Sequence, residues 1–310
     1  MMIYLQLAAG LALLIVGGDL LVRGAVDIAR HLGVSPLLIG LTLVGFGTST
    51  PELVASIQAA LAGSPGIAVG NVVGSNICNI LLIIGLAALL QPLATPKAAF
   101  LRDGGVMLLA AIICTGLVLG GHLGRPAGAV LLAMLVAYVY YSYRSERQAP
   151  GAPQSREAAG LSWFVALLAF VGGLALTIYG ARLLVFAAID LARATGISDT
   201  IVGLTVVAIG TSLPELVTSV MAGIRRQPAV AFGNILGSSI YNVLGILGVT
   251  ALVQPLDIPA EIAALDIWVM LGATVMLLLF AVSKWFVSRW EGAVFLAAYA
   301  VYLGYLARIA

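Results

Sequence analysis

The chain has 310 residues, of which 62% are hydrophobic and 9% are charged, and its formal net charge is +2. Soluble globular domains carry about 25% charged residues, so this composition excludes a soluble globular protein, and we expect no nucleic-acid partner. We expect a multi-pass protein of the cell membrane (the inner or plasma membrane), for which the lipid bilayer is the main solvent.

Apolar stretches long enough to cross a bilayer recur along the whole chain. A helix needs about 20 predominantly apolar residues to span the hydrocarbon core. We therefore expect an all-α membrane protein with ten transmembrane helices. In chain order, their expected ranges are 3–29, 37–61, 67–90, 98–119, 127–143, 161–191, 201–224, 229–253, 262–282 and 292–306.

The Lys and Arg residues predict the orientation of these helices. The loops on one side hold Arg30, Lys97, Arg102, Arg144, Arg147, Arg156, Arg225, Arg226, Lys284 and Arg289, whereas the other side holds Arg125, Arg193 and Arg308. Because cytoplasmic loops carry the excess of Lys and Arg, we expect both termini to lie outside the cytoplasm. The N-terminus lacks the basic region and cleavage site of a signal peptide, so the first span is expected to be retained.

One polar stretch divides the chain. Residues 142–160, SYRSERQAPGAPQSREAAG, combine Pro, Gly and charge, a composition typical of a flexible linker. We expect a first five-helix unit at 1–143, a cytoplasmic linker at 144–160 and a second five-helix unit at 161–310. Cys78 and Cys114 lie inside apolar spans, which argues against a disulfide framework or a cysteine-based metal site.

The two five-helix units are copies of one repeat. Residues 13–93 align without a gap to residues 176–256, at a constant offset of 163. GVSPLLIGLTLVGFGTSTPELVAS at 33–56 matches GISDTIVGLTVVAIGTSLPELVTS at 196–219, and GNVVGSNICN at 70–79 matches GNILGSSIYN at 233–242. Because five is odd, the second unit starts on the opposite side of the membrane, which predicts an inverted repeat with a substrate site at the repeat interface.

A six-residue motif interrupts the apolar sequence of one span in each unit. It reads GTSTPE at 47–52 and GTSLPE at 210–215. Pro51 and Pro214 have no N–H and exclude the carbonyl four residues earlier, so we expect the carbonyl oxygens of Gly47 and Gly210 to be free. In hydrocarbon, such a break survives only where it is buried in protein or lines a wet cavity. The two motifs therefore predict an ion site inside the bundle.

Each motif ends in a carboxylate, Glu52 or Glu215, about 15 residues into its span and hence near the bilayer midplane. Insertion scales put a central acidic residue at roughly 2.5–3.5 kcal/mol. The spans 37–61, 67–90, 201–224 and 229–253 contain no Lys or Arg. We therefore expect a mobile cation, or protons, to balance these charges.

The third and eighth spans supply further polar groups. Ser75 and Asn79 lie four residues apart, and Ser238 and Asn242 repeat that spacing, which places each pair on one helical face. Hydrogen bonding between helices, without ion contact, is the alternative for such residues, but their duplication beside a duplicated glutamate favours an ion site. Small residues that allow close helix packing accompany them at Gly70, Gly74, Gly233 and Gly237.

The ligand types indicate which ions bind. Carboxylate, amide, hydroxyl and carbonyl oxygens form a hard-oxygen set that suits the six to eight ligands of calcium. Sodium suits the same oxygens, whereas Mg²⁺ dehydrates reluctantly and soft metals are disfavoured. Two bare carboxylates cannot easily pass through an occluded apolar state, but a divalent ion or two or more monovalent ions can neutralise them. The site therefore predicts obligatory antiport.

These paired motifs resemble those of the sodium/calcium exchangers of the cation/calcium antiporter superfamily, whose two alpha-repeats carry GTSxPE followed by a GN-x-x-GSN-type segment. The resemblance covers nearly the whole chain. It implies an ion site between the second, third, seventh and eighth helices, and sliding of the first and sixth helices to alternate access. It also implies a transporter without enzymatic activity or cofactor, and we expect it to function as a monomer.

The resemblance also implies a ligand set. Glu52 and Glu215 would bind calcium, and the residues that complete the calcium or sodium sites would be Thr48, Ser49, Ser75, Asn79, Thr211, Ser212, Ser238 and Asn242. Thr48 and Thr211 would act mainly through backbone oxygen. Potassium-dependent members have Asp at the position of Asn242, so potassium co-transport is not expected. Ser239 replaces the Asn expected after Gly-Ser, whereas the first repeat keeps Asn76.

Three other functions remain as alternatives. A proton/calcium antiporter of the same superfamily would use the carboxylates as proton carriers, but its motif usually lacks the Thr-Ser before Pro-Glu. A cation channel needs an open pore, usually from several subunits. A membrane enzyme is disfavoured because the chain has no GxSxG, HExxH or paired-aspartate motif.

Other charges in the spans have a structural interpretation. Asp19 and Arg23 are four residues apart and are expected to neutralise each other within the first helix. Arg182 is expected to extend its side chain toward the membrane surface. Asp27 and Asp190 fall near helix ends and are expected to be interfacial.

Overall fold

The computed structural model describes residues 2–94, 97–148, 160–194 and 208–309. Almost all of them are helical, which confirms an all-helical membrane protein. Eight described helices are long and apolar enough to cross a membrane, and a ninth span results when a bent helix pair is counted as one. The seventh expected span, 201–224, lies partly outside the described residues.

The first half of the chain forms a series of helices with short strands between them. In chain order, its elements are α1 (Met2–Leu32), α2 (Pro36–Ile39), the π-helical segment η1 (Gly40–Val44), α3 (Gly45–Thr48), α4 (Thr50–Leu61), α5 (Pro65–Ile77), the π-helical η2 (Cys78–Ile84), α6 (Gly85–Leu90), β1 (Leu93–Ala94), α7 (Lys97–Leu119), β2 (His122–Leu123) and α8 (Arg125–Gln148). Helix α8 extends five residues into the stretch predicted as a linker, and residues 149–159 of that stretch lie outside the described part of the chain.

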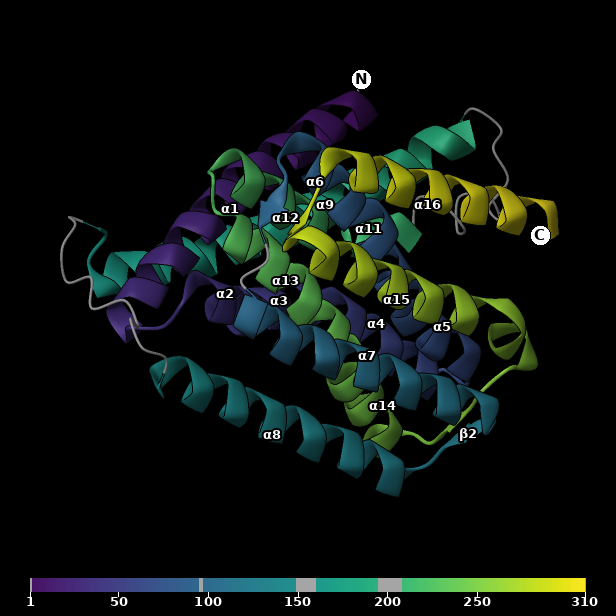
Figure 1. The fold of residues 1–310 in the computed structure, drawn as a ribbon. Helices are drawn as coiled ribbons and strands as arrows, with labels where there is room; N and C mark the ends of the chain where they lie inside the picture. The colour runs from purple at the N-terminus through teal and green to yellow at the C-terminus, as the bar shows by residue number, and fades with distance from the viewer. Residues whose placement is uncertain (1, 95–96, 149–159, 195–207, 310) are drawn as a thin grey trace.

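The second half repeats much of this order. It contains α9 (Trp163–Ala194), α11 (Ala208–Thr211), α12 (Leu213–Ile224), α13 (Pro228–Tyr241), the π-helical η4 (Asn242–Leu247), α14 (Gly248–Val253), β3 (Leu256–Asp257), the π-helical η5 (Ile262–Asp266), α15 (Ile267–Lys284), β4 (Phe286–Val287) and α16 (Arg289–Ile309). Figure 1 shows α8 along the lower edge and α16 at the upper right, with α13 between them.

Short strands join the two halves outside the helices. Strand β1 pairs antiparallel with β4, with Leu93 opposite Val287. Strand β2 pairs antiparallel with β3, with Leu123 opposite Leu256. Each pair takes one strand from either half, so the two halves are linked at both two-stranded ribbons.

Glycines allow α1 and α9 to lie in close contact. A Cβ added at Gly24 would lie 2.4 Å from the backbone nitrogen of Phe170, and one at Gly173 would lie 2.4 Å from that of Leu21. Real Cβ atoms do not approach so closely, so only glycine permits this packing. The two longest helices of the chain therefore form one tightly packed pair.

Close packing also brings α13 against the helix that carries the first motif. A Cβ at Gly233 would lie 2.4 Å from the Leu37 oxygen, and one at Gly237 would lie 2.1 Å from the Leu41 oxygen. The expected small-residue contact is confirmed for these two glycines. The stretch equivalent to η1 by the repeat offset, 203–207, lies outside the described residues.

The helix that carries the first motif is broken where the sequence predicts it. Helices α2–α3 and α4 meet at an angle of 43°, and Ser49 between them has φ −81° and ψ 8°. Pro51 then occupies the first turn of α4, where a backbone N–H would have no partner within that helix. The second motif has the same form, because Ser212 separates α11 from α12 with φ −87° and ψ 7°.

Candidate ion-binding site

The two motifs contact each other through reciprocal hydrogen bonds. Ser49 Oγ donates to Glu215 Oε1 at 2.8 Å, and Ser212 Oγ donates to Glu52 Oε1 at 3.3 Å. All four side chains are at most 1% exposed. The two bonds are equivalent under the repeat offset of 163, because Ser212 corresponds to Ser49 and Glu215 corresponds to Glu52. Each serine therefore orients the glutamate of the opposite motif.

Two asparagines that were not predicted from the sequence hold the glutamate helices in place. Asn71 Nδ2 donates to the Glu52 backbone oxygen at 3.1 Å and to Ser56 Oγ at 2.9 Å. Asn234 Nδ2 makes the equivalent bonds to the Glu215 oxygen at 3.3 Å and to Ser219 Oγ at 3.0 Å. The duplicated Gly-Asn pair at 70–71 and 233–234 was the available sequence signal.

Four predicted ligands present a buried oxygen with no hydrogen-bond partner. These atoms are Glu52 Oε2, Glu215 Oε2, Asn79 Oδ1 and Asn242 Oδ1. Buried polar atoms are nearly always satisfied, and each unsatisfied one needs an explanation. Here the four atoms come in two pairs related by the repeat offset. A cation bound among them would supply the missing partner.

The amide of Asn242 is oriented by a contact that the sequence did not reveal. Asn242 Nδ2 donates to Asn76 Oδ1 at 3.0 Å, and Asn76 Nδ2 donates to the Ser239 backbone oxygen at 3.2 Å. The Asn242 Oδ1 atom is thereby left without a donor. The difference between Asn76 and Ser239 therefore has a consequence, because Ser239 has no amide with which to orient Asn79 in the same way.

The two asparagines that are predicted as ligands lie where the regular helix is interrupted. Segment η2 begins at Cys78 and includes Asn79, and η4 begins at Asn242. Segments of π-helix are rare and occur frequently at functional sites. No sequence signal for these segments was identified.

The remaining predicted ligands differ in how their side chains are used. Thr48 Oγ1 donates to the Val44 oxygen at 3.0 Å, so this hydroxyl already has a partner within its own helix. Ser238 Oγ donates to the Gly45 oxygen at 3.2 Å, which leaves its lone pairs available. Ser75 is buried in α5, and Thr211 lines a cavity beside the motifs.

A sequence profile of the sodium/calcium exchanger protein family matches residues 2–144 and 165–308. The chain belongs to this family. It is 33% identical to the sodium/calcium exchanger MaX1 of Methanosarcina acetivorans, with 97% of each chain covered. It is 38% identical to the inner membrane protein YrbG of Escherichia coli, with 90% of this chain and 87% of the relative covered.

Solved structures agree with this assignment. The sodium-calcium exchanger NCX_Mj, soaked with 2.5 mM Na⁺ and 10 mM Sr²⁺, superposes with a TM-score of 0.85 and 34% identity, with 98% of each chain covered. An exchanger is a transporter and not an enzyme, so family membership agrees with the expectation of no enzymatic activity.

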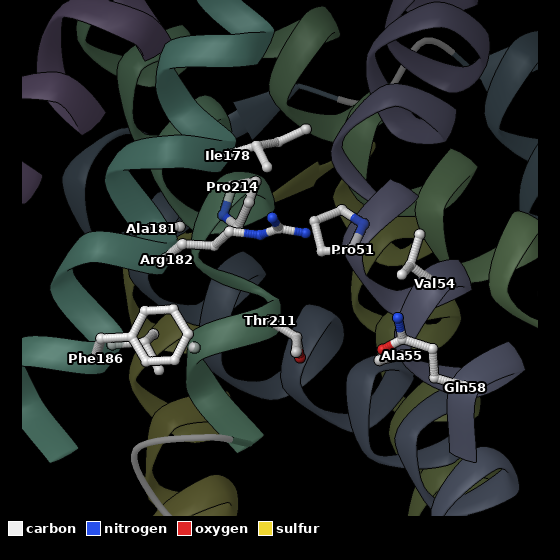
Figure 2. Close-up of a pocket in the computed structure, with 12 residues that line it drawn as sticks. Pro51, Val54, Ala55, Gln58, Ile178, Ala181, Arg182, Phe186, Thr211 and Pro214 are labelled. Carbon is white, nitrogen blue, oxygen red and sulfur yellow. The ribbon is translucent and has the colours of Figure 1, made fainter. Parts of the chain in front are cut away.

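In this exchanger, a cavity adjoins the two motifs on the α9 side. It has a volume of about 180 Å³ and is lined by Pro51, Val54, Ala55, Gln58, Ile178, Ala181, Arg182, Val185, Phe186, Gly210, Thr211 and Pro214. Figure 2 shows the Arg182 side chain extending from α9 toward Pro51. Each lining proline directly precedes one of the two glutamates, so the cavity reaches the edge of the candidate site.

On the α1 side, the exchanger is closed by packing and by charge. A Cβ at Gly18 would lie 2.8 Å from Val217 Cγ1, so α1 and α12 are in tight contact. Asp19 pairs with Arg23 at 3.1 Å, as expected, and also with Arg225 just beyond the end of α12. Arg225 is therefore part of a link between helices and not only a loop residue.

One further charge differs from the sequence interpretation. Arg102 was expected in a loop, but it lies within α7, where its side chain is 10% exposed and bound to Asp103 at 2.6 Å. Asp27 was expected near a helix end, and it lies in the last two turns of α1, where it is 8% exposed. It accepts hydrogen bonds from Arg30 at 2.8 Å and from the Leu161 backbone nitrogen at 3.2 Å, at the start of the second half.

Proposed function

We propose that this exchanger carries calcium against sodium by alternating access, through one site formed by both GTSxPE motifs. The observation that carries the proposal is the set of four buried oxygens without partners on Glu52, Glu215, Asn79 and Asn242. Two of them belong to carboxylates, whose combined charge matches one divalent ion or two monovalent ions. Family membership supports the same ions.

The donor types favour calcium over softer metals. Within the described residues, no group of three or more His, Cys, Asp and Glu side chains is placed to hold a metal ion. The candidate site instead combines two carboxylates with amide and hydroxyl oxygens, which are ligands for a hard cation. The structural relative NCX_Mj was soaked with sodium and with strontium, a divalent cation of the same group as calcium.

We infer that the chain has ten transmembrane helices arranged as two inverted five-helix repeats, 1–143 and 161–310, on either side of the 144–160 linker. The reciprocal Ser49–Glu215 and Ser212–Glu52 bonds support a twofold relation between the halves. Such an axis in the membrane plane would place the site near the midplane. The excess of Lys and Arg favours termini outside the cytoplasm.

Alternating access follows from the difference between the two sides of the site. The cavity between α9 and α4 adjoins the motifs and would give ions a path to them, whereas the α1–α12 contact is closed by Gly18 and the Asp19 ion pairs. Transport requires the opposite arrangement in turn, with α1–α12 open and α9–α4 closed. The tightly packed α1–α9 pair is suited to move as one body between these states.

The test is calcium uptake by the purified protein in proteoliposomes under imposed ion gradients. An outward sodium gradient should drive uptake, and potassium alone should not, because Asn242 is neutral. Uptake driven by a proton gradient without sodium would instead support the alternative, a proton/calcium antiporter. A conducting cation channel would show flux that neither saturates nor exhibits counterflow.

A further inference from the structure

The cavity that leads to the motifs carries a positive charge. Of its lining residues, all of which lie in the described part of the chain, only Arg182 is charged. Gln58 and Thr211 are the other side chains with polar ends, and both are neutral. A passage for cations is expected to be neutral or negative, so the arginine needs a functional explanation.

No described carboxylate pairs with Arg182 within 4 Å, in contrast to Asp19 at the equivalent position of α1, which binds two arginines. The side chain is exposed, and Figure 2 shows it pointing toward Pro51, which lines the same cavity as Pro214. The residues that follow these prolines are Glu52 and Glu215. The charge is therefore not neutralised by an ion pair with any described residue, and it lines the cavity that adjoins the candidate site.

We propose that Arg182 makes the exchanger discriminate between cations by valence, an inference that rests on the proposed sodium/calcium exchange. A positive potential lowers the local concentration of a monovalent cation by a certain factor. It lowers the local concentration of a divalent cation by the square of that factor, so calcium is depleted more strongly than sodium. Arg182 shifts the competition at the shared site toward sodium without contacting either ion.

The expected size of the effect on ion binding follows from the distance over which charges interact in salt solution. Arg182 lies within about one Debye length of an ion entering the cavity, about 8 Å at physiological ionic strength, where screening is incomplete. Removing the charge should lower the half-saturating sodium concentration about threefold and that of calcium about tenfold. Both effects should shrink as ionic strength rises.

The experiment varies the charge at one position of the full-length protein. In Arg182→Cys, a methanethiosulfonate reagent that carries a trimethylammonium group restores the positive charge, and one that carries a sulfonate reverses it. The native Cys78 and Cys114 are 3% and 0% exposed, so the wild-type protein treated with both reagents is the background control. Arg308→Gln removes the same charge from the exposed end of α16, and its half-saturating concentrations should equal those of the wild type.

The readout is the half-saturating concentration of each ion in proteoliposome exchange. For each ion, the logarithm of the half-saturating concentration should rise as the charge at position 182 becomes more positive. The slope for calcium should be twice the slope for sodium. Equal slopes, or values that do not depend on the charge, would overturn the proposal. If Arg182→Cys does not fold, Arg182→Lys and Arg182→Gln provide the same comparison, because only the former keeps the charge.

These outcomes are separate from the test of the proposed function. A wild-type protein without sodium-dependent calcium flux would refute the exchange itself. A wild-type protein that exchanges the ions, combined with unchanged values in the Arg182 variants, would refute only discrimination by valence.

Discussion

The two sides of the candidate site are built from equivalent residues but differ in structure. On the α1–α12 side, Gly18 packs on Val217 and Met221 so closely that an added Cβ would lie 2.8 Å and 3.0 Å from their side chains. On the α9–α4 side, the residues at the same repeat positions are Ala181, Val54 and Gln58, and they line a cavity of about 180 Å³.

Charge differs between the two sides in the same way. Asp19 of α1 links to Arg225 beyond the end of α12, and Arg23 adds a second partner. The equivalent of Asp19 is Arg182, and the equivalent of Arg225 is Ala62, which cannot form an ion pair. Among the described residues, only the α1–α12 contact therefore has an ion pair that stabilises its closed form.

The candidate site and the helix contacts on either side of it differ in symmetry. The candidate site is symmetric, as expected if both motifs supply ligands to one ion in either state, as proposed. The flanks need not be symmetric, and their difference sets the balance between the two states. Gly18 and Asp19 both stabilise closure of the α1–α12 side, which is the arrangement that the structure shows.

The largest loss of calcium affinity should come from substituting either of the two glutamates in the candidate site. Glu52→Gln or Glu215→Gln removes one of the two charges that balance a divalent ion. Truncating a buried charge pair costs about 3–5 kcal/mol, so calcium affinity should fall at least about a hundredfold. Calcium exchange by the folded variants in proteoliposomes measures this. Glu261→Gln, at an exposed position before η5, is the matched control, and wild-type flux in either site variant would refute the assignment.

The second largest effect is expected from adding a charge at one of the two equivalent asparagines, Asn79 and Asn242. Asn242→Asp adds a carboxylate that must be deprotonated to bind a cation, so calcium affinity should fall by up to about tenfold more per pH unit on acidification than in the wild type. It also removes the Nδ2 donor to Asn76. Calcium titrations between pH 5 and 8 measure the slope, with Asn79→Asp as the matched variant. An unchanged slope would place Asn242 outside the ion site.

The reciprocal serine bonds should contribute less. Hydrogen bonds to charged groups contribute about 1.5–3 kcal/mol, so Ser49→Ala should weaken calcium binding about tenfold. Ser212→Ala should have a smaller effect, because its bond to Glu52 is longer, at 3.3 Å against 2.8 Å. Thr50→Ala removes a neighbouring hydroxyl that bonds only the Phe46 oxygen and should bind calcium as the wild type does. A larger loss in Thr50→Ala than in Ser49→Ala would argue against this assignment.

Most of the fold could be predicted from the sequence. Span boundaries were predicted well because apolar runs end abruptly at polar or charged residues. Eight of the ten expected spans appear as single described helices with ends a few residues from those predicted. The repeat singled out duplicated polar residues as candidate ligands, and four of the eight buried side-chain oxygens without partners in the described part of the chain lie on them.

What the sequence did not reveal depends on contacts between distant segments. Asp19 and Arg225 are 206 residues apart, and no periodicity connects them. Arg182 of α9 lines the cavity beside the motifs because of how α9 packs, which no pattern in its own span specifies. The bond between Asn76 and Asn242 depends on the close approach of α13 and α5, which no local pattern specifies.

The smallest expected effect tests the closed flank directly. Asp19→Asn should favour opening of the α1–α12 side by about 1 kcal/mol, a typical upper value for an exposed ion pair, or about fivefold in population. A cysteine at Met221 should then react about fivefold faster with a membrane-impermeant thiol reagent. A cysteine at Gln58, in the open cavity, should change little, because the state that exposes it remains the major one. Arg225→Gln should have the same effect, and the double variant should add nothing further. Additive effects of the two substitutions would show that Asp19 and Arg225 do not hold this side closed together.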